Sequence, residues 1–314
     1  MVESFDPKSL QQWWPKPATP RPIVIFGAGS IVGDAHLPAY KKAGFPVAGI
    51  YDPNREKAEA LASQWGVRAF ASQEEVVAVE NAIFDLATPP VAHASILKLL
   101  PKGSFALIQK PMGSDLAGAT EILKVCRERD IQAAVNFQLR FAPMMLALKD
   151  AVAKGLLGNP LGVHAKTLGH PNHDVAQTRT AAILDYGDKV RCVVSVNHDH
   201  DFGRKFQACE FRISGTEGAA YVKLGVNLDY PRGEPDELWI RPAGGQDWVQ
   251  VPLEGAWFPD AFENRMANLQ RFATGEDGLL IGSVEDAWQT MALVEAAYES
   301  SASPATPLAK LPEA

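Results

Sequence analysis

Short apolar runs alternate with longer amphipathic stretches from Arg21 to Phe137, and this alternation constrains the fold more than any other feature of the sequence. The apolar runs are too short for helices and have the composition of strands buried on both faces. Strands are predicted at residues 22–26, 47–51, 82–87, 105–108 and 132–137. Helices are predicted between them at residues 31–43, 54–65, 91–100 and 114–129, with another beginning at the capping-box sequence 72–75. The pattern predicts an α/β fold with a doubly wound parallel sheet of six strands, five of them assigned to residues.

The sequence after Pro143 has a different pattern. A helix predicted at residues 144–154 is followed by strand-like segments at 161–168, 178–185, 190–197, 206–214, 219–225, 237–241 and 248–251. Hairpin-like turns at residues 185–188 and 215–218 connect them without helices, so a large, open, mainly antiparallel sheet is predicted. Helices at 259–274 and 284–300 complete the sequence. The predicted organisation is an N-terminal arm at residues 1–20, an α/β domain at 21–142 and an α+β domain at 143–314.

The composition disfavours several classes of protein. Of the 314 residues, 46% are hydrophobic and 21% are charged, as in ordinary soluble globular domains. No apolar run reaches the roughly 18 residues of a membrane helix, so no membrane association is predicted. The net charge of −7 disfavours nucleic acid as a partner, because an acidic surface repels phosphates. The three cysteines form no CxxC pair and the first residues lack the apolar core of a signal peptide, which predicts a cytoplasmic protein with reduced cysteines and no metal site.

A glycine-rich turn directly follows the first predicted strand. In the sequence Gly27-Ala-Gly29-Ser30-Ile31, glycines permit a tight turn, and the helix that begins there directs free N–H groups toward a pyrophosphate. Asp52 ends the next strand, where its carboxylate can accept hydrogen bonds from an adenosine ribose and repels a 2′-phosphate. The pattern predicts a dinucleotide-binding Rossmann domain that prefers NAD, while Arg55 leaves NADP open. A βαβ turn that binds no nucleotide is the alternative.

Two further motifs follow the strands predicted at 82–87 and 105–108, at the carboxyl edge where open α/β sheets bind ligands. Thr88 and Pro89 form a stiff loop suited to flank a nicotinamide ribose, with a plain strand-to-helix turn as the alternative. In Gln109-Lys110-Pro111, a lysine at this edge can hydrogen-bond a substrate hydroxyl and stabilise alkoxide character, although taken alone it resembles a surface lysine. His93 is more typical of a capping histidine than of a catalyst, and it is included among the candidate cofactor contacts.

Together these motifs resemble the Gfo/Idh/MocA family of sugar and polyol oxidoreductases over most of the chain. The glycine-rich turn and the following His36-Leu-Pro-Ala39 are similar to that family's opening signature. Gln109-Lys110-Pro111 is similar to its Glu-Lys-Pro motif, with glutamine in place of the usual glutamate. Residues 136–143, 213–218 and 283–287 are similar to the crossing into its second domain, a hairpin of its large sheet and the start of its last helix.

The resemblance implies an NAD(P)-dependent dehydrogenase or reductase that transfers a hydride between the nicotinamide and a hydroxyl or keto carbon of a small carbohydrate substrate. It implies that Lys110 is the catalytic lysine and that Asn136 and Arg140 lie near the substrate. The candidate cofactor-binding residues are Gly27, Gly29, Ser30, Ile31, Asp52, Thr88, Pro89, His93, Gln109 and Lys110. Family members commonly pair their large sheets across a dimer interface, so a homodimer or larger homo-oligomer is expected.

One family feature is missing from the sequence. The family usually carries a helix with the pattern Asp-x-x-x-His, which supplies a general acid/base histidine, and no such helix is found here. By comparison with the family, a few dozen residues are absent at the junction of Gly158 and Asn159. His170 and His173 are candidate substrate contacts, with a surface role as the alternative. The missing helix supports a second hypothesis, a dinucleotide-binding sensor or partner subunit without catalysis.

Overall fold

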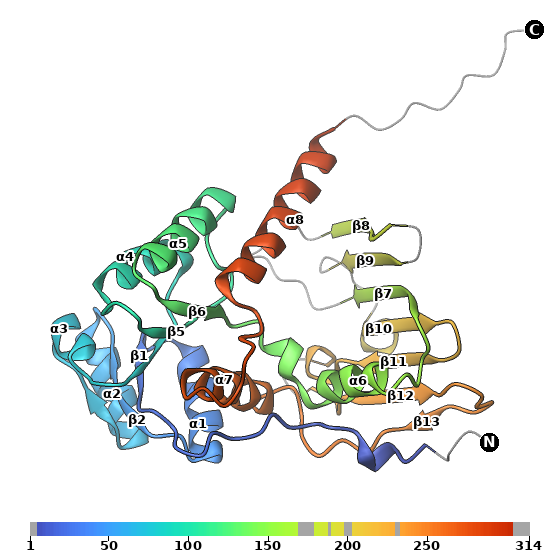
Figure 1. Cartoon of the computed structure of the whole chain (residues 1–314), viewed down its shortest axis with the longest axis horizontal. Coiled ribbons are helices and arrows are strands. Elements are labelled where there is room, and N and C mark those ends of the chain that lie inside the picture. The colour runs from blue at the N-terminus through green and yellow to red at the C-terminus, as the bar shows by residue number, and fades with distance from the viewer. Residues whose placement is uncertain (1–4, 169–178, 188–189, 198–202, 230–232, 304–314) are drawn as a thin grey trace, which may run out of the picture.

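The first sheet has six parallel strands. The fold comes from a computed structural model, and the structure describes residues 5–168, 179–187, 190–197, 203–229 and 233–303 (Figure 1). The sheet order is β3-β2-β1-β4-β5-β6, and all five pairings are parallel. This confirms the predicted doubly wound sheet, and the strand that had no assigned residues is β3. The strands are β1 (Ile23–Phe26), β2 (Val47–Tyr51), β3 (Arg68–Ala69), β4 (Ile83–Leu86), β5 (Phe105–Ile108) and β6 (Gln132–Val135).

The helices between these strands begin where a side chain satisfies free backbone N–H groups. Asn54, Ser72 and Asp115 cap the first turns of α2, α3 and α5. The helix predicted at residues 31–43 is divided, because a π-helical stretch (Val32–His36) precedes α1. Pro38 has no N–H with which to continue a regular α-helical pattern across this point. The helices are α1 (Leu37–Ala43), α2 (Arg55–Trp65), α3 (Gln73–Val77), α4 (Pro90–Leu99) and α5 (Leu116–Glu128).

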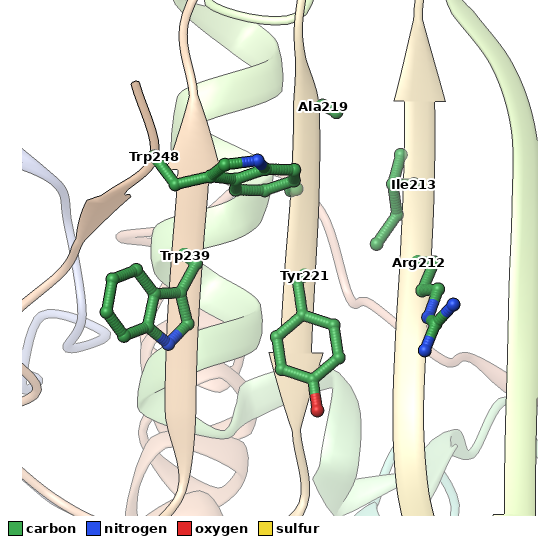
Figure 2. Close-up of a pocket in the computed structure, with 7 residues that line it drawn as sticks. Arg212, Ile213, Ala219, Tyr221, Trp239 and Trp248 are labelled. Atoms are coloured by element: carbon green, nitrogen blue, oxygen red, sulfur yellow. The ribbon is translucent and has the colours of Figure 1, made fainter.

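The second sheet has the order β13-β12-β11-β10-β7-β9-β8. All pairs are antiparallel except β7 with β9, which confirms the mainly antiparallel prediction. The helix α6 (Pro143–Ala153) packs on one face of β10, β11 and β12. The opposite face carries Trp239, Tyr221 and Trp248 side by side (Figure 2). The strands are β7 (Pro160–Leu168), β8 (Arg179–Asp185), β9 (Arg191–Asn197), β10 (Ala208–Gly215), β11 (Ala219–Lys223), β12 (Glu237–Arg241) and β13 (Val249–Gln250).

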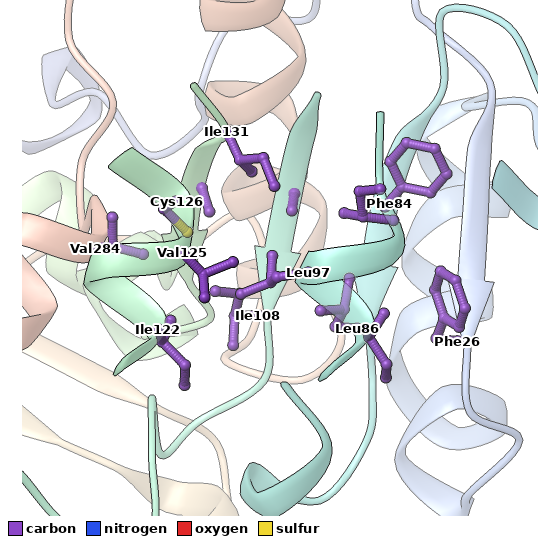
Figure 3. Close-up of a cluster of buried hydrophobic side chains, with 14 of the residues drawn as sticks. Phe26, Phe84, Leu86, Leu97, Ile108, Ile122, Val125, Cys126, Ile131 and Val284 are labelled. Carbon is purple, nitrogen blue, oxygen red and sulfur yellow. The ribbon is translucent and has the colours of Figure 1, made fainter. Parts of the chain in front are cut away.

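Apolar clusters cover both faces of the first sheet. On one face, Phe26, Leu86 and Ile108 from three neighbouring strands pack with Leu97 of α4 and with α5 (Figure 3). On the other face, the strands pack against α1 and α7 (Asp260–Ala273). Because both faces are buried, the strands read as continuous apolar runs in the sequence. The carboxyl ends of the strands therefore remain as the natural place for a ligand.

The last two helices pack on the first sheet although they follow the second one in sequence. The helix α8 (Val284–Ala302) lies along α5, and Val284 joins the cluster in Figure 3. Ser283 also pairs with Ala134 of β6 in an isolated β-bridge. The division of the chain at residues 20 and 142 stays a prediction. Within the described residues, no helix combines the length and apolar character needed to span a bilayer.

Candidate functional site

A cavity of about 400 Å³ opens at the carboxyl ends of β1, β2 and β4. Five of the predicted cofactor contacts line it: Gly27, Gly29, Asp52, Thr88 and Pro89. Its remaining lining is largely apolar and includes Phe26, Tyr51 and Ile96. The structure thus brings together residues from four separate parts of the sequence, in a cavity with apolar walls and a few polar groups. Such a composition is typical of small-molecule sites.

Gly27 is the position at which the turn requires glycine. Its φ is +107°, and a Cβ at this residue would lie only 2.3 Å from the carbonyl oxygen of Ala87. Gly29 has the opposite character, because a Cβ there would meet no atom within 4 Å. Gly27 therefore allows β1 and β4 to approach closely, while Gly29 leaves open space beside the helical segment. Both properties fit a turn that admits a pyrophosphate.

Asp52 organises the turn through its carboxylate. Oδ2 accepts a hydrogen bond from the N–H of Ala28 at 2.8 Å, and Oδ1 accepts one from the N–H of Asn54, also at 2.8 Å. The carboxylate remains at the cavity wall, where its free lone pairs can accept further hydrogen bonds. Ser30 is exposed and Ile31 is half-buried at the start of the helical segment, and neither lines the cavity.

His93 is buried behind the cavity and connects two loops. One ring nitrogen, Nε2, lies 2.9 Å from the carbonyl oxygen of Thr88, and Nδ1 lies 3.1 Å from the carbonyl oxygen of Met112. Burial lowers the pKa of His93, and its two carbonyl neighbours oppose this effect. The structure therefore places His93 as a link between the Thr88 loop and the Lys110 loop, without a place in the cavity wall.

Gln109 and Lys110 follow β5 at the same edge of the sheet. The N–H of Gln109 donates to the carbonyl of Leu86 at 3.1 Å, which extends the pairing with β4 one residue beyond the end of β5. The N–H of Lys110 donates to Oε1 of Gln109 at 2.9 Å, and the side chain of Lys110 is exposed. The Lys110–Pro111 peptide is cis. Among the described residues, no hydrogen bond or ion pair holds the exposed ammonium group of Lys110, so it can meet a ligand that enters from the carboxyl edge.

Asn136 and Arg140 lie beyond the end of β6. The N–H of Asn136 donates to the carbonyl of Ile108 at 2.7 Å, and its buried side-chain amide has no hydrogen-bond partner among the described residues. Arg140 forms an ion pair with Asp286 of α8 and stacks over Phe137. The two remaining substrate candidates, His170 and His173, lie outside the described residues.

A buried polar cluster next to this edge was missed by the reasoning from sequence. It consists of His36, Tyr40 and Asp85, all fully buried between α1 and the sheet. The detectable signal was Asp85, a carboxylate within an otherwise apolar strand. His36 was noted only as part of a family signature, and nothing in the sequence pairs it with Asp85.

Residues 21–137 match the model of the Gfo/Idh/MocA oxidoreductases, a family with an NAD-binding Rossmann fold. By this match, residues 21–137 are similar to the cofactor-binding domain of the Gfo/Idh/MocA oxidoreductases. The match ends at β6, so the family's cofactor-binding half is the half that matches.

Two characterised relatives and one solved structure are similar to the chain. A 1,5-anhydro-D-fructose reductase from Ensifer adhaerens is 25% identical over 81% of this chain and 91% of its own length. An inositol 2-dehydrogenase from Streptomyces avermitilis is 30% identical over 58% of this chain and 52% of its own length. The structure is an oxidoreductase from Agrobacterium radiobacter in complex with NAD+, L-tartaric acid and magnesium, with a TM-score of 0.69 and 20% identity over 90% of this chain and 97% of that one. The likeness extends across both sheets and confirms the predicted two-part fold.

Proposed function

We propose that this protein is an NAD-dependent oxidoreductase that acts on a hydroxyl or keto carbon of a sugar, polyol or related carbohydrate. The observation that carries the proposal is that the glycine turn, Asp52 and Thr88 line one cavity at the carboxyl edge of an NAD-binding fold. Lys110 does not line this cavity but follows β5 at the same edge. The names of the similar reductase and dehydrogenase support carbohydrate as the substrate class. NADP is the secondary cofactor candidate, because the carboxylate of Asp52 disfavours a 2′-phosphate.

The cofactor supplies the hydride chemistry when it is bound. In this proposal, N–H groups of the turn from Gly27 to Ile31 hold the pyrophosphate, with Ser30 at the first helical residue. Asp52 accepts hydrogen bonds from the adenosine ribose, and Thr88 and Pro89 border the nicotinamide side. Gln109 and His93 hold the loops that carry these contacts.

Lys110 is the proposed catalytic residue. Its ammonium group donates a hydrogen bond to the reacting oxygen of the substrate. This hydrogen bond orients the hydroxyl or keto carbon and stabilises negative charge on the oxygen. Asn136 and Arg140 are proposed to contact the substrate. The unpaired amide of Asn136 supports this role, while Arg140 would have to share its guanidinium with Asp286.

The test combines binding with turnover. NADH fluorescence titration measures cofactor affinity, and absorbance at 340 nm follows a panel containing 1,5-anhydro-D-fructose, myo-inositol and D-apiose. Lys110→Met is expected to bind NADH within about two-fold of wild type and to lose at least 100-fold in kcat. Lys102→Met is the matched control, because Lys102 is an exposed lysine at the opposite end of β5. NADH binding without turnover across the panel, unchanged by Lys110→Met, contradicts the enzyme and favours the sensor.

We also propose that a second copy of the chain covers the open face of the second sheet. One row across this face joins Trp239, Tyr221, Arg212, His164, Val193 and Ile183 through directly paired strands. The face includes an apolar cavity of about 440 Å³, and Ile183 is 74% exposed (Figure 2). Apolar surface of this kind is typical of subunit interfaces.

Light scattering tests the proposed dimer. A mass of about twice 34.0 kDa is expected for wild type, and Trp248→Glu on this face is expected to shift the protein to a single-chain mass. A single-chain mass for wild type would contradict the dimer. Among the described residues, Cys126, Cys192 and Cys209 form no disulfide, which supports a cytoplasmic location that fractionation of the native host would test.

A further inference from the structure

A fully buried carboxylate lies in the middle of the first sheet. Asp85 is on β4, between apolar neighbours of an all-buried strand, and its side chain has no exposure to solvent. Removing an ionised carboxylate from water costs several kcal/mol unless hydrogen bonds compensate. The hydroxyl of Tyr40 donates to Oδ2 at 2.7 Å, and Nδ1 of His36 lies 2.6 Å from the same oxygen. An apolar side chain would satisfy a buried strand at lower cost, so the carboxylate must serve something other than packing.

The hydrogen-bond partners of His36 determine where its proton resides. Nδ1 faces the carboxylate of Asp85 and therefore carries a hydrogen, because a carboxylate can only accept. Nε2 lies 3.4 Å from Nε2 of Gln109. The other end of that amide, Oε1, accepts the N–H of Lys110, so the amide group that faces His36 is the donor. Nε2 of His36 must then accept, and the ring is neutral with its proton on Nδ1.

A continuous series of hydrogen bonds thus runs from the core to the proposed catalytic loop. It passes from Asp85 to His36, from His36 to Gln109, and from Gln109 to the backbone N–H of Lys110. Every donor meets an acceptor, which leaves one orientation for the Gln109 amide. Since that amide holds the backbone from which the Lys110 side chain projects, its orientation sets the direction of the lysine.

We propose that His36 and Asp85 are positioning residues for Lys110 and act on it through the side chain of Gln109. This proposal rests on the function proposed above, in which Lys110 contacts the substrate. The role of Gln109 follows from a comparison with glutamate. A glutamate carboxylate at this position would accept hydrogen bonds from both Nε2 of His36 and the N–H of Lys110. That arrangement requires a doubly protonated His36. Glutamine instead keeps His36 neutral and leaves no negative charge beside the ammonium of Lys110.

The charged and titratable groups around His36 are compatible with a neutral ring. Asp85 faces it from β4 and Tyr40 from α1, and Tyr40 stays protonated because burial and Asp85 raise its pKa. Phe262 of α7 packs on the ring at a centroid distance of 5.1 Å. Arg265, also on α7, interacts electrostatically with Tyr40, and burial lowers its pKa to about 9. The cluster therefore holds the carboxylate of Asp85 and the guanidinium of Arg265 on either side of the His36 ring, which lies between the sheet and α7.

Nuclear magnetic resonance tests the hydrogen-bond series without any substrate. In protein labelled with ¹⁵N-histidine, long-range ¹H–¹⁵N spectra distinguish the three protonation forms of the ring, and His36→Gln assigns the His36 signals. Wild type is expected to show a proton on Nδ1 alone, and Gln109→Glu is expected to show protons on both nitrogens. A doubly protonated His36 in wild type, a proton on Nε2 alone, or an unchanged ring in Gln109→Glu overturns the proposal.

Kinetics test the positioning of Lys110. Gln109→Met keeps the length of the side chain but removes both hydrogen bonds, and kcat at saturating NADH is expected to fall at least 10-fold. Phe84→Leu is the control for lost packing, because Phe84 is buried on the same strand as Asp85 but belongs to the cluster on the opposite face of the sheet. Equal losses of kcat in the two variants, or none in Gln109→Met, overturn the proposal. If nothing in the substrate panel turns over, the proposed function fails, while the spectra still decide the hydrogen-bond series.

Discussion

The replacement of Gly27 by alanine is the sharpest test of the cofactor site. The new Cβ would lie 2.3 Å from the carbonyl oxygen of Ala87, a distance that forces the ends of β1 and β4 apart. Strain at a φ of +107° costs about 1–3 kcal/mol, and forcing an extra methyl into a packed site costs about 1–3 kcal/mol more. Gly27→Ala is therefore expected to lose about 2–6 kcal/mol, a large part of the roughly 5–15 kcal/mol typical of a folded protein.

Gly29→Ala is the matched control two residues away. Its Cβ would meet no atom within 4 Å and its backbone needs no left-handed conformation, so the free energy of unfolding is expected to stay within about 0.5 kcal/mol. The methyl group would instead occupy the open space proposed for the pyrophosphate. NADH affinity is expected to fall at least 10-fold, or about 1.4 kcal/mol.

Urea unfolding and NADH fluorescence titration separate the two effects. Gly27→Ala should lower the unfolding midpoint and weaken NADH binding, whereas Gly29→Ala should weaken binding alone. An unchanged midpoint in Gly27→Ala would show that β1 and β4 are not in the close contact described. Normal NADH affinity in Gly29→Ala would contradict the proposal that the glycine turn binds the cofactor.

Three further predictions concern groups around this site and in the core. Asp52→Ala removes the acceptor of two N–H groups and is expected to weaken NADH binding at least 10-fold in the same titration, with about 1–3 kcal/mol lost in urea unfolding. His93→Phe leaves the loops of Thr88 and Met112 unlinked and is expected to weaken NADH binding about five-fold, so unchanged affinity would contradict the linking role. Burial and the charge of Glu285 raise the pKa of Cys126 to about 12, so at pH 8 its thiol stays protonated, and peptide mass spectrometry should find it alkylated by iodoacetamide only in urea.

The central strands of the first sheet were predictable because they are buried on both faces. Burial makes β1 and β5 continuous apolar runs and leaves β4 apolar except for Asp85. The helices between them carry capping residues that can be recognised, as Ser72 shows. The two-residue β3 was missed because it is partly exposed and too short to show any period. Glycine turns and strand ends also indicated residues at one edge, since parallel strands share one carboxyl edge, and five of these residues line one cavity.

Contacts between distant segments could not be predicted in the same way. The link from His93 to Met112 and the pairing of His36 with Asp85 depend on how helices pack, and a single sequence contains no signal for such pairs. The docking of α8 against α5 is hidden for the same reason, because amphipathic helices fit several partners. Candidate site residues in a glycine turn or at a strand end could be predicted from the sequence. Residues proposed to act through a buried partner could not.

The way the second sheet is covered indicates where the family segment that is missing from the sequence would enter the chain. At the expected junction, the chain is closed tightly: the N–H of Asn159 donates to Oγ1 of Thr216, and a Cβ on Gly158 would lie 2.3 Å from that same atom. An inserted segment would have to break this contact, so the junction of Gly158 and Asn159 is a poor place for one.

A row of directly paired residues on the face of the second sheet that packs against α6 indicates a different place for an inserted segment. It runs Ile240, Ala220, Ile213, Val163, Cys192, Leu184 from β12 to β8. Its first three members are buried beneath α6, and the last three are only half-buried. Among the described residues, the thinly covered part of the sheet is therefore β7, β9 and β8. A helix that covers these strands in a longer relative would enter the chain after β7, between β7 and β8, and not before β7. The shortfall that the family resemblance implies would therefore fall in the layer over β8 and β9, outside the residues 21–137 that match the family.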